Sequence, residues 1–259
     1  MLDKSYEEII DFCYRANYGR IDEFVNHDGY LSAFSNTLKD FYYNHLIPMD
    51  GTDCRELLIS HKDEFAVRGH QPCVYTTPLS FNYKNPVDGL KCVEMESFLW
   101  YDRENVPALP ADKDYVVKIV GPERMEEYIA IFNAAFSTGV YAGLVGPEYA
   151  DAERKFFTHA PNGFKSLIFL VEYKGHAVGG MCAVISGNMA FLYSMAVLPD
   201  ARIGGMAAKQ LGAVVLKELF DRGATNIFLQ TEYDSKLEHF YNYYGFERLF
   251  VGRYWMEED

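Results

Sequence analysis

Residues 193–210, YSMAVLPDARIGGMAAKQ, constrain the fold of this chain more than any other stretch. The stretch begins as an apolar run typical of a strand, is interrupted at Pro199, passes through Gly204 and Gly205, and continues as a segment typical of a helix. Small residues let the backbone approach a ligand closely. The first N–H groups of a helix have no partner inside it, so they can bind an anion. Because Arg202 adds a planar cation suited to phosphate, the stretch predicts a strand–loop–helix that holds a diphosphate.

Two motifs in this half of the chain resemble the GNAT superfamily of N-acetyltransferases. Members carry Arg/Gln-x-x-Gly-x-Gly/Ala after a strand that ends in Val-x-Pro, and residues 197–199 (VLP) and 202–207 (RIGGMA) follow this pattern. A second family signature, residues 240–246 (FYNYYGF), follows at the expected distance. The resemblance covers about residues 113–259 and implies the fold of the family, with acetyl-CoA as the cosubstrate.

The resemblance also implies the cofactor-binding residues. The diphosphate would lie on the loop formed by Arg202, Ile203, Gly204, Gly205, Met206 and Ala207. The pantetheine arm would pair with the end of the preceding strand at Met195, Ala196 and Val197, since an extended amide chain can add to a free strand edge. Backbone N–H groups of that strand end would meet the thioester carbonyl.

The second signature supplies a candidate catalytic residue. In the family a tyrosine of this motif protonates the departing thiolate, and here that residue is Tyr241. A phenol with a pKa near 10 can donate to a thiolate of roughly 8 to 9 only if the site tunes it; the alternative is that Tyr241 only packs against the cofactor. Asp234 stands where many members have Asn, so it is interpreted either as a cofactor contact or as a helix N-cap.

The general base is not identified by the sequence. Glu172, Glu232, His159 and His239 qualify by residue type, but each also suits a surface or capping role, and a chain of water molecules is a further alternative. The glycine-rich loop at 139–146 is interpreted either as the acceptor side of the cleft or as a plain connection. Neither this loop nor residues 204–207 have the spacing of a dinucleotide fingerprint, and the chain contains no P-loop.

Composition excludes several classes of function. The net charge of −13 argues against non-specific binding to nucleic acid or anionic membranes, which requires a basic surface. No apolar run approaches the length of a membrane span. Five cysteines, without Cys-x-x-Cys pairs, indicate a reducing, cytoplasmic environment, and no His/Cys cluster has metal-binding spacing.

In residues 113–259 we expect strands at 115–120, 166–172, 177–186, 189–197, 227–231 and 248–256. We expect helices at about 121–136, at 147–157, from the 202–207 loop to about 221, and at 235–244. Their order is β-α-α-β-β-β-α-β-α-β, an α/β fold with a mixed central sheet flanked by helices. Prolines 107 and 110 mark a linker, so the predicted domains are 1–112 and 113–259. In the first half we expect helical segments at 5–26 and 31–42, a connection at 46–53, a short helix at 57–67, and strands at 72–77 and 93–101.

Several segments of the first half resemble segments of the second half in sequence. Residues 73–77, 89–90 and 100–101 match residues 227–231, 245–246 and 254–255 in character and spacing. The first half is therefore interpreted as a degenerate copy of the same fold without the Arg-x-x-Gly loop, although chance similarity of apolar strands is the alternative.

The sequence thus predicts an acetyl-CoA-dependent N-acetyltransferase that transfers the acetyl group directly to an amine. The alternative is a non-catalytic acyl-CoA-binding or interaction protein that retains the fold. The acceptor is not identified, and a homodimer is left open.

Overall fold

The computed structural model describes residues 2, 4–101, 108, 112–137 and 146–258. The chain forms two compact units: unit 1 comprises residues 1–100 and 230–259, and unit 2 comprises residues 101–229. The chain passes from unit 2 into unit 1 within strand β10 (Asn226–Glu232). Most of the expected linker at 106–114 lies outside the described residues. The domain boundary at 112, which was predicted from the two prolines, stays a prediction.

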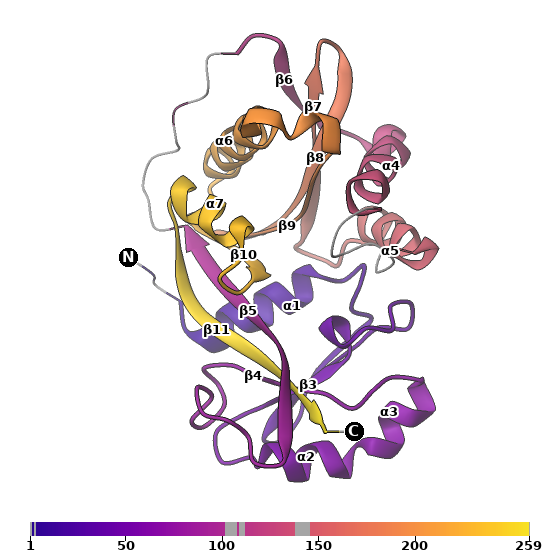
Figure 1. The fold of residues 1–259 in the computed structure, drawn as a ribbon, viewed down its shortest axis with the longest axis vertical. Helices are drawn as coiled ribbons and strands as arrows, with labels where there is room; N and C mark the ends of the chain where they lie inside the picture. Colours follow the sequence, from indigo (N-terminus) through magenta and orange to yellow (C-terminus); the bar gives the residue numbers. More distant parts are fainter. Residues whose placement is uncertain (1, 3, 102–107, 109–111, 138–145, 259) are drawn as a thin grey trace. The chain divides into compact units, whose positions relative to one another are not determined.

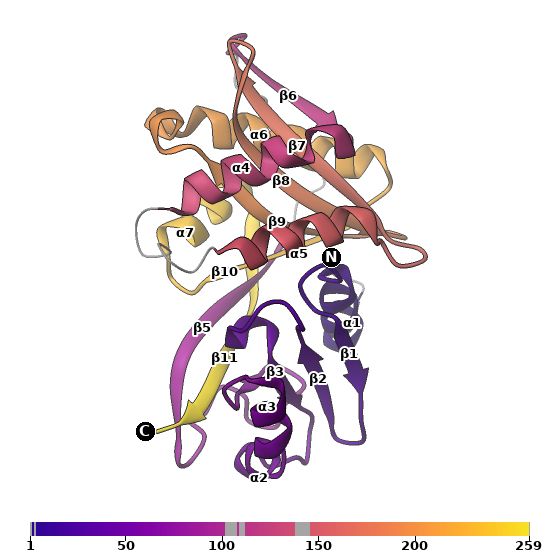
Figure 2. The same ribbon diagram turned by 90° about the vertical axis from the view of Figure 1, so that its right-hand side faces the viewer.

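Unit 2 is a sheet with helices on both faces (Figures 1 and 2). In chain order it contains β6 (Tyr115–Val120), the 3-10 helix η2 (Pro122–Arg124), α4 (Met125–Phe136), α5 (Pro147–Thr158), β7 (Lys165–Tyr173), β8 (His176–Ser186), β9 (Met189–Val197), the 3-10 helices η3 (Pro199–Ala201) and η4 (Ile203–Gly205), α6 (Met206–Asp221) and the start of β10. The strands lie in the order β6–β7–β8–β9–β10. Neighbours are antiparallel except β9 and β10, which are parallel.

Strand β7 shows why this sheet needs a helix layer on each face. Its central residues Leu167–Val171 are all buried, so side chains pointing to both faces are covered. Helices α4 and α5 lie on one face and α6 on the other (Figures 1 and 2). The sequence predicted every helix and strand of this unit to within a few residues, and the α/β fold class is confirmed.

Unit 1 contains a second set of strands with its own helices (Figure 1). In chain order these elements are α1 (Tyr6–Ala16), β1 (Glu23–Asn26), β2 (Tyr30–Phe34), η1 (Phe41–Tyr43), β3 (His45–Pro48), α2 (Cys54–Ser60), α3 (Lys62–Arg68), β4 (Val74–Thr76), β5 (Leu90–Tyr101), α7 (Lys236–Tyr244) and β11 (Phe246–Glu257). The strand order is β1–β2–β3–β4–β11–β5, and the N–H of Tyr233, just after β10, donates to the carbonyl of Met95 on β5 (3.1 Å).

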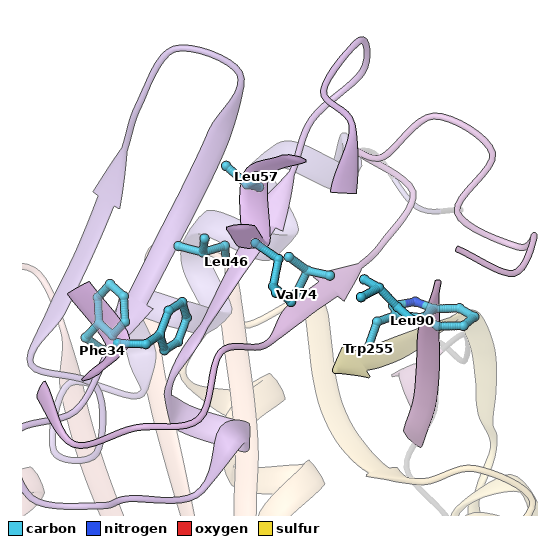
Figure 3. Packing of buried hydrophobic residues seen from close by; sticks show 8 residues of the cluster. Phe34, Leu46, Leu57, Val74, Leu90 and Trp255 are labelled. Atoms are coloured by element: carbon cyan, nitrogen blue, oxygen red, sulfur yellow. The ribbon is translucent and has the colours of Figure 1, made fainter. Parts of the chain in front are cut away.

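The core of unit 1 forms where α2 and α3 cover one side of this sheet (Figure 3). Leu57 of α2 and Phe65 of α3 pack with side chains from five strands. These strand residues are Phe34 of β2, Leu46 of β3, Val74 of β4, Leu90 of β5 and Trp255 of β11. Because Trp255 comes from the last strand of the chain, the core of unit 1 is completed only when the C-terminal residues are in place.

Three expectations for the first half of the chain are wrong. The first helix ends at Ala16, and residues 23–26 and 30–34 form an antiparallel hairpin instead of continuing helices. The segment at 46–53 is not only a connection, since it begins within strand β3. The turn residues Asp28 and Gly29 carried the correct signal, because Asp-Gly between short apolar runs is typical of a hairpin. The apolar residues of 31–42 form runs so short that their spacing fits the 3.6-residue period of a helix and the 2-residue period of a strand equally well.

The two halves of the sequence repeat the same arrangement of elements. Strand β3 runs parallel to β4 with helices between them, as β9 runs parallel to β10 with α6 between them. The final strands of the halves, β5 and β11, both have 12 residues and both follow a glycine. This correspondence supports the interpretation of the first half as a degenerate copy.

Among the described residues, no helix is long and apolar enough to cross a membrane.

Candidate functional site

The loop at 202–207, hereafter the cradle, has the backbone that the sequence predicts. Gly204 (φ 69°) and Gly205 (φ 66°) both take left-handed conformations, which carry no penalty for glycine. Gly205 occupies the N-cap position of α6, and no side chain in the described part of the protein caps the first amides of this helix. A methyl group added at Gly204 would meet no atom within 4 Å. A helix N-terminus without a side-chain cap, beside open space, suits an anion such as a diphosphate.

Two cations lie at the cradle. Arg202 donates from Nε to the carbonyl of Val197 (2.9 Å) and from Nη2 to the carbonyl of Ala135 (2.7 Å). Its guanidinium therefore ties the end of β9 to the last turn of α4, a positioning role that the sequence did not reveal. Lys209, which the sequence analysis did not single out, lies one turn into α6, where its Cε would be 3.8 Å from a methyl group added at Gly205.

The strand before the cradle contains a β-bulge. Tyr193 of β9 pairs with Cys182 of β8, but the next pair is Ala196 with Gly180, so Ser194 and Met195 face a single residue of β8. Ser194 has a φ of 54°, a left-handed conformation that is uncommon for a residue with a side chain. The hydroxyl of Tyr128, a fully buried residue of α4, donates to the carbonyl of Ser194 (2.9 Å).

The predicted strand-end residues surround this bulge. Met195 is half-buried, whereas Ala196 and Val197 are buried. Within unit 2 the parallel ladder to β10 covers Met189 to Leu192, and residues 193–197 of β9 extend beyond it. The roles assigned to Met195, Ala196 and Val197 stay predictions.

The other predicted cofactor residues occupy defined positions. Ile203 belongs to η4, whereas Met206 and Ala207 form the first turn of α6. The glycine-rich loop lies outside the described residues over 139–145, so its predicted role remains a prediction.

Tyr241 and Asp234 belong to unit 1, whereas the cradle belongs to unit 2. The Tyr241 side chain is 7% exposed, and burial raises the pKa of its phenol well above 10. Such a phenol stays protonated, but full proton transfer to a thiolate near 8.5 is then uphill. The role of Tyr241 as an acid therefore stays a prediction that requires the bound site to tune it.

Asp234 is exposed and takes a left-handed conformation (φ 54°) just before α7. The N-cap of α7 is Ser235, whose hydroxyl accepts from the N–H of Glu238 (3.1 Å), so the capping interpretation of Asp234 is wrong. The N–H of Asp234 donates to the fully buried carboxylate of Glu238 (2.6 Å). Its predicted cofactor contact remains a prediction.

One of the candidate bases is held in an ion cluster. The buried carboxylate of Glu172 accepts from Lys118 (2.6 Å) and from Arg124 (2.7 Å), and these hydrogen bonds hold its pKa below the ordinary value of 4.5. A carboxylate stabilised in this way is a weak base, so Glu172 serves the packing of β6, β7 and α4. His239 lies 3.7 Å from Asp234 at the surface, and His159 contacts Thr158.

Sequence analysis missed a buried carboxylate in unit 1. Glu96 of β5 accepts from the hydroxyl of Tyr254 (2.8 Å), and Tyr254 stacks on Tyr75 with ring centroids 4.2 Å apart. Burial raises the pKa of Glu96 to about 7. Nearby, His45 donates from Nδ1 to the carbonyl of Phe41 and accepts from Tyr14, while burial lowers its pKa to about 4. The signal available in the sequence was Glu96 close to the apolar and aromatic end of this strand, residues 98–101.

The corresponding strand-to-helix junction of unit 1 differs from the cradle. There the N-cap of α2 is Asp53, whose carboxylate accepts from the N–H of Glu56 (2.8 Å) and occupies the helix terminus. A groove of about 740 Å³ at this junction is lined by Asp53, Glu56 and Asp88, with Arg55 among them. Carboxylates at these positions repel a diphosphate, so this junction does not repeat the anion site proposed at the cradle.

Fold and site together define an α/β domain with a candidate anion-binding loop where strand β9 passes into helix α6. Residues 126–246 match the acetyltransferase (GNAT) family, so the resemblance predicted from the sequence for this part of the chain is confirmed. No curated protein matches the sequence.

Solved structures with the same fold span the whole chain. A GCN5-related N-acetyltransferase from Kribbella flavida has a TM-score of 0.72 at 12% identity and covers 100% of this chain and 97% of its own. One from Sphaerobacter thermophilus has a TM-score of 0.60 at 16% identity, covering 98% and 85%. A tandem GNAT protein from the clavulanic acid biosynthesis pathway has a TM-score of 0.53 at 16% identity, covering 77% and 68%. At these identities the likeness concerns the fold alone, and one of the similar structures is a tandem GNAT protein.

Proposed function

We propose that the protein is an acetyl-CoA-dependent N-acetyltransferase that transfers the acetyl group directly to an amine. The observation that carries the proposal is the cradle: two left-handed glycines, uncapped amides of α6, and the cations Arg202 and Lys209 beside them. The match to this family supports acetyl transfer as the reaction.

The residues of the chain have separable tasks in this reaction. Amides of Met206 and Ala207 at the start of α6 bind the diphosphate, and Arg202 fixes the loop that presents them. The cosubstrate supplies an acetyl group activated as a thioester. As the C–N bond to the amine forms and the C–S bond breaks, an N–H group in the β9 bulge stabilises the charge on the carbonyl oxygen.

Two protons must also move. The attacking amine loses one to a base, which we leave to a water chain or an acidic side chain, and the departing thiolate gains one. We assign the second proton to Tyr241, whose high pKa keeps it protonated at neutral pH. All five cysteines are free thiols, which supports a reducing compartment such as the cytoplasm.

Binding and turnover test the proposal separately. Calorimetry with acetyl-CoA tests the cradle, and thiol release in the presence of an amine panel tests transfer. Binding without thiol release from any amine would favour the alternative, a non-catalytic acyl-CoA-binding protein. A mass-spectrometric gain of one acetyl group on the amine would confirm the direction of transfer.

A charge placed in the cradle gives the sharpest test of its location. Gly205→Glu puts a carboxylate at the N-terminus of α6 and should weaken acetyl-CoA binding at least 10-fold, since it repels the diphosphate. The matched control is Gly187→Glu in the β8–β9 turn, because Gly187 also has a positive φ (58°) and open space around it. Equal affinity in both variants would refute the cradle.

A further inference from the structure

We propose that Tyr128 is a positioning residue that fixes the direction of the Met195 N–H, the group that meets the acyl carbonyl. The inference rests on the proposed function and assigns a task to a residue that neither motif contains. It follows from the geometry of the β9 bulge, which lies wholly within unit 2.

The first observation is the hydrogen bond itself. The Tyr128 hydroxyl on α4 donates to the carbonyl oxygen of Ser194 over 2.9 Å. Helix α4 packs against β8 and β9, so this carbonyl is turned toward the helix layer. In a trans peptide the carbonyl of one residue and the N–H of the next point in opposite directions. The Ser194 carbonyl therefore directs the Met195 N–H to the side of β9 away from α4.

The second observation is that the bulge has a strained backbone. Ser194 holds a φ of 54°, and residues with side chains adopt this region only where their surroundings impose it. Rotation of the peptide between Ser194 and Met195 would reverse the Met195 N–H and leave the φ of Ser194 unchanged. The buried hydroxyl of Tyr128 opposes this rotation, because it would lose its acceptor.

The third observation concerns the space that Tyr128 occupies. Its ring lies directly over Gly180 of β8, the partner of Ala196 beside the bulge. A methyl group added at Gly180 would be 2.7 Å from Cδ2 of Tyr128 and 3.0 Å from the carbonyl oxygen of Phe169. The missing side chain at Gly180 thus lets the tyrosine reach the bulge, and a glycine in a strand interior is typical of such a close approach.

The test compares two ligands that differ only in the carbonyl. Acetyl-CoA offers an acceptor to the Met195 N–H, whereas S-ethyl-CoA is a thioether without one. Wild-type protein should bind acetyl-CoA more tightly, as measured by calorimetry. Tyr128→Phe keeps the ring and removes the hydroxyl, so it should weaken acetyl-CoA by about 5-fold and leave S-ethyl-CoA within twofold. It should also lower kcat about 10- to 100-fold.

Controls separate this role from general stability. Tyr115→Phe removes a hydroxyl from the edge of the same unit and should change neither affinity. Should Tyr128→Phe fail to fold, Gly180→Ala displaces the ring instead and should give the same difference between ligands. Nuclear magnetic resonance with ¹⁵N-methionine supplies an independent readout, since the Met195 amide signal of wild-type protein should shift with acetyl-CoA but not with S-ethyl-CoA.

The other possible results of the binding experiment refute either the role of Tyr128 or the proposed function. Equal weakening of both ligands would show that Tyr128 only supports the fold, and unchanged affinity for both would show that the hydroxyl is not needed. Either result refutes the inference while leaving acetyl transfer intact. If wild-type protein bound neither ligand, the proposed function itself would fail.

Discussion

Replacement of Glu96 by glutamine should change how the stability of the protein depends on pH. The carboxyl accepts from Tyr254, and burial raises its pKa from 4.5 to about 7, with further increases from the charges of Glu94 and Asp40. The phenols of Tyr14 and Tyr75 also face it, and both are held protonated by burial. No cation is among the groups that shift this pKa, so only the hydrogen bond from Tyr254, which lowers the pKa, offsets part of the cost of ionising Glu96.

The sign of the effect follows from proton binding. Between pH 4.5 and about 7 the folded protein holds the Glu96 proton and the unfolded chain releases it. The stability from this group is therefore complete below pH 4.5 and is lost as the pH rises to about 7. A difference of about 2.5 pKa units corresponds to about 3 kcal/mol, an upper value because part of the residue reaches the surface.

The assay is urea unfolding of wild-type protein and Glu96→Gln at pH 5, 6, 7 and 8. Glutamine keeps an acceptor for the Tyr254 hydroxyl and cannot ionise. The stability of the variant relative to wild type should rise by roughly 2 to 3 kcal/mol from pH 5 to pH 8. Glu257→Gln removes a surface carboxylate from the same unit and corrects for the change in net charge. A relative stability that stays flat across this range would show that Glu96 is not protonated in the folded state.

Three shorter predictions concern other sites. Gly252→Ala would place a methyl group against the hydroxyl of Tyr75 and should cost about 1 to 3 kcal/mol in urea unfolding; an unchanged midpoint would contradict the packing. Tyr241→Phe should lower kcat at least 10-fold while calorimetry finds the acetyl-CoA affinity within twofold, and wild-type turnover would remove it as the acid. Glu172→Gln should destabilise by about 1 to 3 kcal/mol at neutral pH, and because the pKa of Glu172 is lowered, this difference should shrink as the pH falls below 4; a constant difference would refute the ion cluster.

The sequence predicted the second half of the fold well because its elements are long and strongly patterned. Strand β9 and strand β6 begin and end where the sequence analysis placed them. The prediction for the first half failed where the elements are short and aromatic. A strand of 5 residues such as β2 has too few positions to distinguish the period of a strand from that of a helix. Helices α2 and α3 were expected as one short segment.

In the candidate site, features set by neighbouring residues were predictable from the sequence, and contacts between residues far apart in the sequence were not. The cradle is local, so two glycines and a proline in sequence were enough to predict its backbone. The contact between Tyr128 and Ser194 joins residues 66 positions apart, and the sequence around either residue does not predict it. The same limit hid the carbonyl partners of Arg202, one of which lies on α4.

The pairing of β11 with β4 has a consequence for any attempt to dissect the protein. Arg253, Tyr254 and Trp255 align with residues 74–76, so the end of the polypeptide completes a sheet begun by its first hundred residues. A fragment starting at residue 113 would contain β11 without its partner β4, so the strand edge and Trp255 would be exposed to solvent. An exposed apolar strand edge is prone to aggregation. Mixing the two fragments should restore solubility, because each of them carries part of unit 1.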